Sequence, residues 1–313
     1  MQPARNGADR ASIRSVLMIA NPASRRGASA IRSATRTFAS LELPCDVVVT
    51  AHRGHATEIL TAIRTARGHD YDAIFTLGGD GTAVEVISAL SPGGPPVGVL
   101  PGGTGNLLAR ALGIPLSVPR AIRALVHGDE AMVDMGRLGD GTRFVIGAGV
   151  GIDASMIAGT SPAWKRRAGV MAYVVAGSAH VLRRRRFVAT VTVDGETVTR
   201  QAAVVLVANF GVLLNGLVTL GAGIRRDDGK LDVCIFDPVT TIDIARVTYK
   251  LLFRDFKPDP AMTYIRGERI VVQTEPALPA QADGELIGST PFTAVVEPLA
   301  ARLLVPDCQI NRQ

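Results

Sequence analysis

Hydrophobic residues recur with different periods in the two parts of the chain. In the first third, short apolar runs such as 15–20 and 73–77 alternate with stretches whose apolar residues recur at helical spacing. Repeated strand–helix units of this kind predict an α/β domain, a parallel sheet with helices on both faces. The expected strands are 15–20, 45–50, 73–77 and 97–100, and the expected helices are 29–40, 56–67, 82–90 and 106–112.

After about residue 128, apolar and polar residues alternate with the two-residue period of strands. Asp-Gly pairs separate several of these runs, which is a strong hairpin signal. We therefore predict a β-rich second domain, with helices at 168–186 and 242–256. Its expected strands are 133–138, 143–147, 187–193, 197–207 and further strands between 264 and 306. The predicted domains are 13–132 and 133–298, with 299–313 returning to the first.

Three glycine-containing loops follow three of the predicted parallel strands, where such a sheet presents ligands. They are NPASRRG at 21–27, GGDGT at 78–82 and PGGTGN at 101–106. Glycines let the backbone approach a phosphate, and a helix N-terminus adds N–H donors. Asp80 could hold Mg²⁺ or orient a hydroxyl. The loops predict a phosphate site, although each alone also fits an ordinary strand–helix turn.

Other glycine motifs favour structural roles. The segment 139–142 repeats Gly-Asp-Gly-Thr between two strand-like runs, so it predicts a hairpin turn. Asp-Gly-Glu at 194–196 predicts a hairpin tip, and 283–285 could be another by spacing alone. Gly-Ala-Gly-Val-Gly at 147–151 lacks the full dinucleotide motif, so we expect a packing role. The His52/His55 pair is interpreted as surface at a helix entry, not as a metal site.

Composition limits the function classes. Of the 313 residues, 47% are hydrophobic and 20% charged, which excludes wholesale disorder. The net charge of +6 suits anionic partners, but aromatics make up only 4%, so no nucleic acid is expected. The three cysteines form no C-x-x-C pair, which argues against a disulfide framework or zinc site. No signal peptide or transmembrane helix is predicted, and we expect a cytoplasmic protein.

Six ordered segments together resemble the diacylglycerol kinase catalytic family, which includes diacylglycerol, sphingosine and bacterial lipid kinases. The resemblance implies an ATP-dependent lipid kinase that phosphorylates a lipid hydroxyl. It implies a nucleotide-binding α/β domain and a β-sandwich-like lipid-substrate domain, with the active site in the cleft between them. The matching segments are NPASRRG at 21–27, TLGGDGTAVEVI at 76–87, LPGGTGNLLARALGIP at 100–115, GAGVGIDA at 147–154, RRDDGKLDV at 225–233 and QADGELIGSTP at 281–291.

The resemblance also implies residue roles. Glu285 matches the general base, with Asp283 beside it, while Asp80 competes for that role and is ranked first as an organiser of metal and nucleotide. A structural Mg²⁺ is expected at Asp228 and the carbonyls of Arg225 and Lys230. The residues expected to contact ATP are Asn21, Ser24, Thr50, Gly79, Asp80, Gly81, Thr82, Glu85 and Thr104.

Two positions depart from the family pattern, because Val84 and Leu107 stand where Asn and Asp are common. The basic runs 165–167 and 183–186 suggest peripheral contact with an anionic membrane surface, although solvated helix ends are the alternative. A homodimer stays open. The rival functions are a kinase of a soluble substrate, of the NAD kinase type, and an inactive module that binds lipid or nucleotide.

Overall fold

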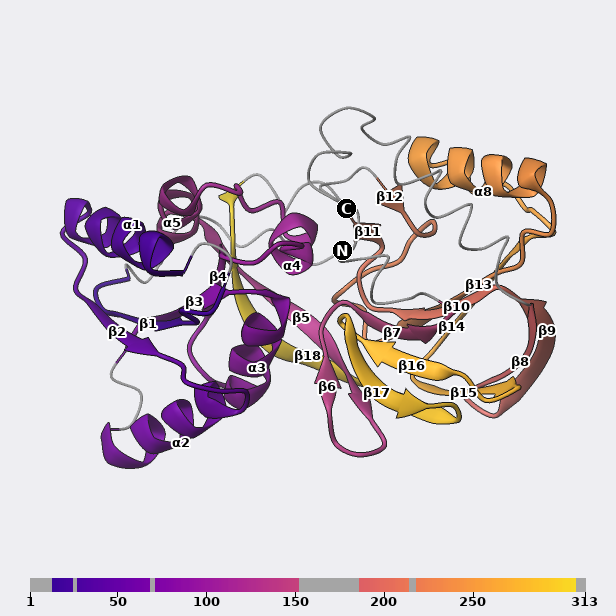
Figure 1. The fold of residues 1–313 in the computed structure, drawn as a ribbon, viewed down its shortest axis with the longest axis horizontal. Coiled ribbons are helices and arrows are strands. Elements are labelled where there is room, and N and C mark those ends of the chain that lie inside the picture. Colours follow the sequence, from indigo (N-terminus) through magenta and orange to yellow (C-terminus); the bar gives the residue numbers. More distant parts are fainter. Residues whose placement is uncertain (1–12, 25–26, 68–70, 152–185, 214–217, 308–313) are drawn as a thin grey trace, which may run out of the picture.

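The N-terminal part is a parallel sheet covered by helices on both faces. The computed structural model describes residues 13–24, 27–67, 71–151, 186–213 and 218–307. The strand order is β2-β1-β3-β4, and helices α1 and α5 lie on one side of the sheet and α2 and α3 on the other (Figure 1). The bounds are β1 Val16–Ala20, α1 Gly27–Ser40, β2 Cys45–Val49, α2 His55–Arg67, β3 Ala73–Gly78, α3 Asp80–Leu90, β4 Val97–Pro101, α4 Leu107–Ala111 and α5 Val118–Val126.

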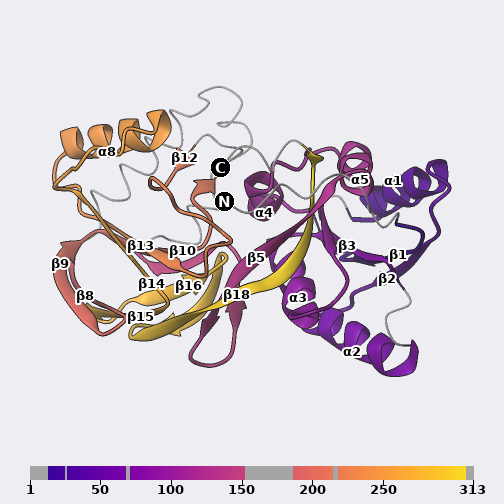
Figure 2. The same cartoon turned by 180° about the vertical axis from the view of Figure 1, so that it is seen from behind.

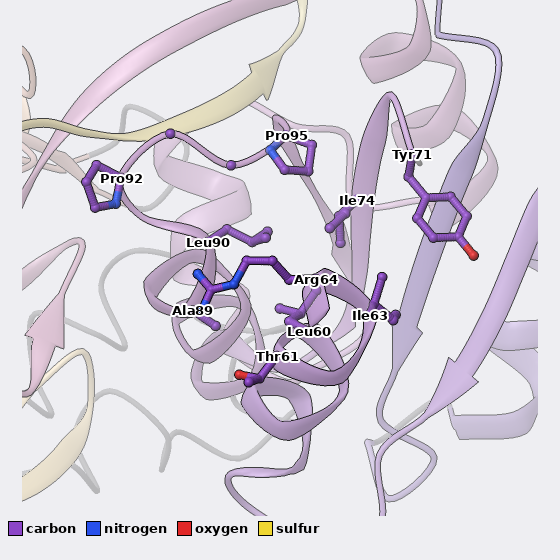
Figure 3. A pocket seen from close by; sticks show the side chains of 12 residues that line it. Leu60, Thr61, Ile63, Arg64, Tyr71, Ile74, Ala89, Leu90, Pro92 and Pro95 are labelled. Carbon is purple, nitrogen blue, oxygen red and sulfur yellow. The ribbon is translucent and has the colours of Figure 1, made fainter. Parts of the chain in front are cut away.

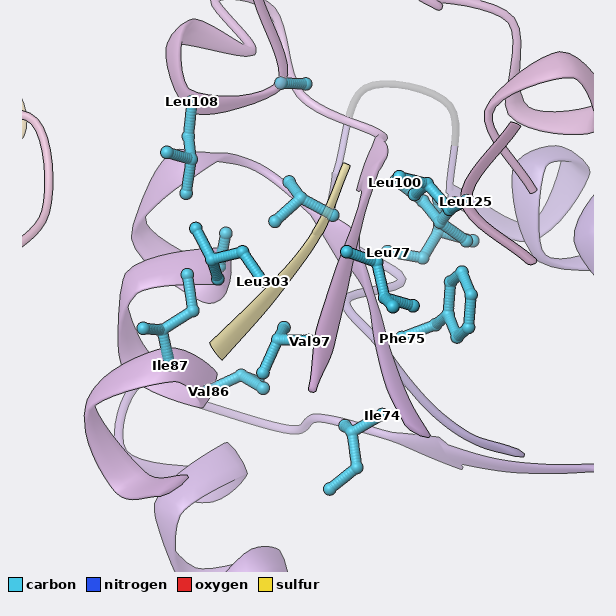
Figure 4. Close-up of a cluster of buried hydrophobic side chains, with 14 of the residues drawn as sticks. Ile74, Phe75, Leu77, Val86, Ile87, Val97, Leu100, Leu108, Leu125 and Leu303 are labelled. Atoms are coloured by element: carbon cyan, nitrogen blue, oxygen red, sulfur yellow. The ribbon is translucent and has the colours of Figure 1, made fainter. Parts of the chain in front are cut away.

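The central strands of this sheet are apolar on both faces because helices cover both sides. Every residue of β1, β3 and β4 is buried, as expected for the inner strands of a parallel sheet. Figure 4 shows side chains of β3 and β4 packed with Val86 and Ile87 of α3 and with Leu303 from the far end of the chain. This core fixes the strand ends from which the glycine loops emerge.

The long strand β18 (Phe292–Val305) runs through both parts of the molecule. It pairs in parallel with β4 through Leu303 and Val97, and antiparallel with β5 (Asp129–Leu138) and β15 (Arg269–Glu275). The sheet therefore continues from β2 to β9 as one ten-stranded sheet, and both views show β18 crossing between the halves (Figure 2). A register shift between Glu297 and Ala301 bends β18 at the crossing.

The C-terminal part is a sandwich of two sheets. A six-stranded antiparallel sheet, β14-β13-β10-β7-β16-β17, packs against the β18-β15-β8-β9 half of the long sheet. Helix α8 (Thr241–Phe253) lies outside the six-stranded sheet (Figure 1). The bounds are β6 Arg143–Phe144, β7 Gly147–Val150, β8 Phe187–Val193, β9 Glu196–Ala202, β10 Val204–Ala208, β11 Val212–Leu213, β12 Val218–Thr219, β13 Leu231–Phe236, β14 Met262–Gly267, β16 Pro279–Ala282 and β17 Glu285–Ser289.

This architecture confirms the predicted fold class of an α/β part followed by a β-rich sandwich. The domain boundaries stay a prediction, since β18 belongs to both parts. Among the helices that the structure describes, none combines the length and apolarity that a membrane crossing requires.

Two predicted elements were wrong in detail, and one helix was missed. The expected strand 197–207 is two strands in different sheets, because Ala203 leaves β9 and donates its N–H to Phe236 O. The expected strand 143–147 is interrupted at 145–146, where the backbone N–H groups turn toward Asp283. Helix α5 was not predicted, although its sequence is amphipathic with a proline in the first turn. The predicted helix 168–186 lies outside the described residues except for its last residue.

Candidate active site

A cleft of about 1090 Å³ opens where the loops after β1, β2, β3 and β4 meet the tips of two hairpins from the C-terminal part. Its volume is slightly above the range of about 300–1,000 Å³ that is typical of small-molecule and cofactor pockets. Asp80 is absent from the lining, and its position is described below. The predicted site residues that line the cleft are Asn21, Ser24, Thr50, Gly79, Gly81, Thr82, Glu85, Thr104, Asp283 and Glu285.

The first glycine loop is tied to the second by Asn21. Its Oδ1 accepts the N–H of Ala23 at 2.9 Å, and its Nδ2 donates to Thr82 Oγ1 at 3.3 Å. The hydroxyl of Ser24 is buried and has no hydrogen-bond partner within the described residues. A buried hydroxyl without a partner is costly, so its position favours a ligand that supplies one.

The second and third loops pack backbone against backbone. Gly102 N–H donates to Gly78 O at 3.0 Å. A Cβ on Gly103 would lie 2.7 Å from Gly79 Cα, closer than any side chain tolerates. Asn106 closes the third loop in the left-handed region (φ 47°), accepting the N–H of Gly103 and donating to its carbonyl. The glycines therefore have two roles. They allow the two loops to pack closely against each other, and they leave room for a phosphate.

Asp80 is turned toward the third loop. It stands in the first turn of α3, and its Oδ1 accepts the N–H of Leu108 at 3.0 Å. The carboxylate thus satisfies a backbone donor at the start of α4 and holds α4 against α3. Its direct contact with nucleotide stays a prediction.

Asp283 is held by the backbone of the segment between β6 and β7. Its carboxylate accepts three N–H groups, from Val145 at 2.7 Å, Ile146 at 2.8 Å and Gly147 at 3.0 Å. Burial raises the pKa of Asp283 to about 6, although the three donors act in the opposite direction. With Gly284 it forms the turn between β16 and β17, both residues having positive φ. The carboxylate therefore fixes the hairpin that presents the next residue to the cleft.

That next residue, Glu285, reaches across the cleft to the second glycine loop. A Cβ on Gly81 would lie 2.7 Å from Glu285 Oε1, so the carboxylate occupies the space that a side chain at 81 would fill. Its other oxygen, Oε2, is paired with the guanidinium of Arg53 from the loop before α2. The predicted base is thus brought next to the predicted phosphate loop from a part of the sequence 200 residues away.

Glu85 and Thr50 also line the wall of the cleft that the N-terminal part forms. Glu85 Oε1 accepts the N–H of Thr57 at 3.1 Å, at the N-terminus of α2, where a negative charge is favoured. Thr50 is buried at the end of β2 and donates its N–H to Ala20 O at 2.9 Å. Both residues therefore have fixed positions on the cleft wall.

Sequence reasoning missed three contributors to the cleft. Arg53 and Arg143 line it. So do residues 140–142 of the turn at 139–142, which repeats the Gly-Asp-Gly-Thr of the second glycine loop and which we name the twin turn. That turn joins β5 to β6 as a hairpin, as predicted, but no sequence pattern indicated that it would meet the glycine loops. Arg53 could have been found, because it belongs to a loop that follows a parallel strand, as the other cleft residues do.

The segment 147–151 has the packing role expected from its sequence. A Cβ on Gly149 would lie 2.4 Å from Val205 O of the neighbouring strand β10. The His52 and His55 rings stack with centroids 4.9 Å apart, and His55 Nδ1 accepts the N–H of Ala51. His52 also lines the cleft.

The predicted metal loop lies at the junction of the two parts. Asp134 of β5 accepts the N–H groups of Gly229 and Leu299, and burial, together with the charges of neighbouring carboxylates, raises its pKa. Asp228 Oδ2 lies 3.6 Å from a guanidinium nitrogen of Arg266, which supplies positive charge of its own. In the described part of the chain, no cluster of three or more His, Cys, Asp or Glu could hold a metal. A cation at Asp228, Arg225 and Lys230 therefore stays a prediction.

A second, much smaller cavity of about 80 Å³ lies between α2, β3 and the turn after α3 (Figure 3). It is lined mainly by apolar side chains such as Leu60, Ile63 and Leu90. None of the predicted site residues borders it, so the chemistry is assigned to the large cleft.

Two protein-family models match this chain. Residues 15–138 match the model of the diacylglycerol kinase catalytic domain, and residues 145–305 match the YegS C-terminal NAD kinase beta sandwich-like domain. The chain belongs to the diacylglycerol kinase catalytic family.

Individual proteins and solved structures are also similar to this chain. The chain is 32% identical over 260 residues to protein sll0036 of Synechocystis, covering 80% of this chain and 60% of that longer relative. It is 28% identical to the diacylglycerol kinase of Bacillus subtilis, covering 74% and 76% of the two chains. A crystal structure of a diacylglycerol kinase from Bacillus anthracis superimposes with a TM-score of 0.71 at 20% identity, covering 95% of this chain and 98% of that chain. That structural likeness supports the fold of this diacylglycerol kinase family member.

Proposed function

We propose that this member of the diacylglycerol kinase family transfers the γ-phosphate of ATP to the hydroxyl group of a lipid. The observation that carries the proposal is the position of Glu285, a carboxylate from the sandwich placed against Gly81 of the phosphate loop. A base on one wall of a cleft and a phosphate-binding loop on the other are the two components that phosphoryl transfer to an alcohol requires.

In the proposed reaction, Glu285 accepts the proton of the lipid hydroxyl. The hydroxyl oxygen then forms a bond to the γ-phosphorus, and the bond to the β–γ bridging oxygen breaks, so that ADP leaves. The backbone N–H groups of the glycine loops and the hydroxyls of Ser24 and Thr82 orient the phosphates. Mg²⁺ that enters with ATP would neutralise charge on the transferring group, the main electrostatic demand of the reaction.

The acceptor side of the cleft is apolar next to the base. Leu286 follows Glu285 and is 72% exposed, and Ile287 and Val84 also line the cleft. An exposed leucine is unremarkable alone, but three apolar side chains beside a carboxylate favour an acceptor with an apolar body. This surface supports a lipid over a soluble nucleotide as the acceptor.

Membrane contact is part of the proposal. Within the described residues, the support comes from a groove between α1 and α5 that is lined by Arg32, Arg36 and Arg123, which we name the arginine groove. Neither helix contains an acidic residue, so the groove suits an anionic surface. We propose peripheral association with the cytoplasmic membrane surface; a homodimer is a further arrangement that sedimentation would detect.

The experiment compares Glu285→Gln with Asp80→Asn in an ATP turnover assay against a panel of lipids that includes diacylglycerol, with NAD as the soluble acceptor. Loss of a general base costs about 10²- to 10⁴-fold in kcat. We expect a loss of that size for Glu285→Gln. Asp80→Asn should lose less, because an amide oxygen can still accept the Leu108 N–H.

Near-normal kcat in Glu285→Gln would refute the assignment of the base. Turnover with NAD but not with any lipid would show a soluble acceptor. ATP binding without turnover on any acceptor would indicate a binding module.

A further inference from the structure

Arg53 is a cation that contacts the proposed base directly. It lies in the short loop between β2 and α2, its side chain is 82% exposed, and its guanidinium is paired with Glu285 Oε2. The pair joins the N-terminal wall of the cleft to the sandwich wall. It therefore closes over the space in which a γ-phosphate and a lipid hydroxyl would have to meet.

The second arginine on the cleft wall is committed to a structural role. Arg143 Nε donates to Glu297 Oε2 at 2.6 Å, and its Nη1 donates to Ser88 O at 3.2 Å. Its guanidinium thereby joins β6 to α3 and β18. Of the arginines that line the cleft in the described part of the chain, only Arg53 has a proposed catalytic group as its sole ion-pair partner.

The Arg53–Glu285 ion pair is suited to an exchange in which a phosphate replaces Glu285 as the partner of Arg53. An ion pair between exposed side chains is stabilised by at most about 1 kcal/mol, so little free energy is needed to break it. A terminal phosphate carries more charge than one carboxylate and presents oxygens that match the guanidinium fork. When such a phosphate enters, Arg53 gains a stronger partner without leaving the cleft.

We propose that Arg53 is the γ-phosphate sensor of this cleft: it holds Glu285 while the cleft is empty and transfers to the terminal phosphate of ATP. The inference rests on the proposed use of ATP. The transfer frees Glu285 Oε2 to accept a proton only when a phosphate is in position to be transferred. Arg53 is thus a binding residue for ATP, and a positioning residue for Glu285.

The first experiment measures binding of ATP and ADP to the full chain by calorimetry, in wild type, Arg53→Gln and Arg53→Lys. Loss of one hydrogen-bonded charge contact weakens binding by about 10- to 100-fold. We expect that loss for ATP in Arg53→Gln, with ADP changed less than about threefold, since ADP has no γ-phosphate. Arg53→Lys should recover part of the ATP affinity. The control is Arg120→Gln, which removes an exposed charge from α5 outside the cleft lining and should change neither affinity.

The second experiment uses the double-mutant cycle with Glu285→Gln. Removal of the competing carboxylate should tighten ATP binding up to about fivefold when Arg53 is present, and leave it unchanged in the Arg53→Gln background. Equal weakening of ATP and ADP in Arg53→Gln, or no weakening of either, overturns the inference. So does a tightening by Glu285→Gln that persists without Arg53.

These outcomes are separate from a failure of the proposed function. A wild-type chain that binds ATP but phosphorylates no lipid refutes the lipid kinase proposal, yet the ATP-to-ADP comparison still decides the role of Arg53. A wild-type chain that binds no ATP refutes both.

Discussion

Replacing Asp283 by asparagine tests how the sandwich presents the proposed base, Glu285, to the cleft. Oδ1 accepts the N–H groups of Ile146 and Gly147, and an amide oxygen can keep both. Oδ2 accepts the N–H of Val145 at 2.7 Å. In Asp283→Asn an NH₂ group would face that donor and leave it unsatisfied, which costs about 1–3 kcal/mol. Asp283→Ala removes the acceptor of all three donors and should cost more.

The pH dependence of this effect has a definite sign. Because the folded-state pKa of Asp283 is raised from 3.8 to about 6, the folded chain retains a proton that the unfolded chain has released. The stability contributed by this group is fully present below pH 3.8 and is lost as pH rises through about 6. A shift of about two pKa units corresponds to roughly 3 kcal/mol.

The assay is urea unfolding of wild type and Asp283→Asn at pH 4.5 to 7.5. The stability advantage of wild type over the variant should shrink with rising pH across this window. An advantage that instead grows with pH would show that the three N–H donors outweigh burial, and would refute the reasoning. Asp194→Asn is the matched control, since Asp194 heads the other Asp-Gly-Glu turn but is exposed and accepts the N–H groups of Glu268 and Arg269. It should lose less stability.

Three further measurements test other parts of the structure. Gly81→Ala should lower kcat at least about tenfold, because its Cβ displaces Glu285 Oε1. The control Gly139→Ala places its Cβ in open space at the twin turn and should leave kcat unchanged. Equal kcat in both variants would contradict the contact between Gly81 and Glu285. Replacing the three arginines of the arginine groove by glutamine should reduce sedimentation with anionic vesicles at low salt, by about 1 kcal/mol per charge removed, whereas binding that ignores salt and the substitutions would contradict membrane contact there. Mg²⁺ should raise the Tm of wild type but not of Asp228→Asn if the predicted structural cation binds, and equal shifts would exclude Asp228 as its ligand.

The sequence predicted that the three glycine loops lie together, because the information there is local. Gly79, Gly81 and Thr104 follow strands whose apolar runs are unambiguous, and parallel strands bring such loops to one edge of the sheet. The partners Gly102 and Gly103 are explained only by the backbone contact with the neighbouring loop.

The sandwich side depends on contacts between distant segments. Asp194-Gly195-Glu196 and Asp283-Gly284-Glu285 have identical sequences, and both form hairpin turns with positive φ at Asp and Gly. Only the second has its Asp bound by three backbone donors 136 to 138 residues away. No local pattern distinguishes them, so the prediction of Glu285 depended on family resemblance.

The course of β18 determines how this protein can unfold. The strand pairs with β4 at its C-terminal end, with β15 at its N-terminal end and with β5 at both ends, so its backbone hydrogen bonds belong to both halves of the molecule. Neither half can lose its structure without removing a central strand from the other. Heat or denaturant should therefore produce one cooperative transition instead of the two expected for independent domains, and the two walls of the cleft should remain joined until the whole chain unfolds.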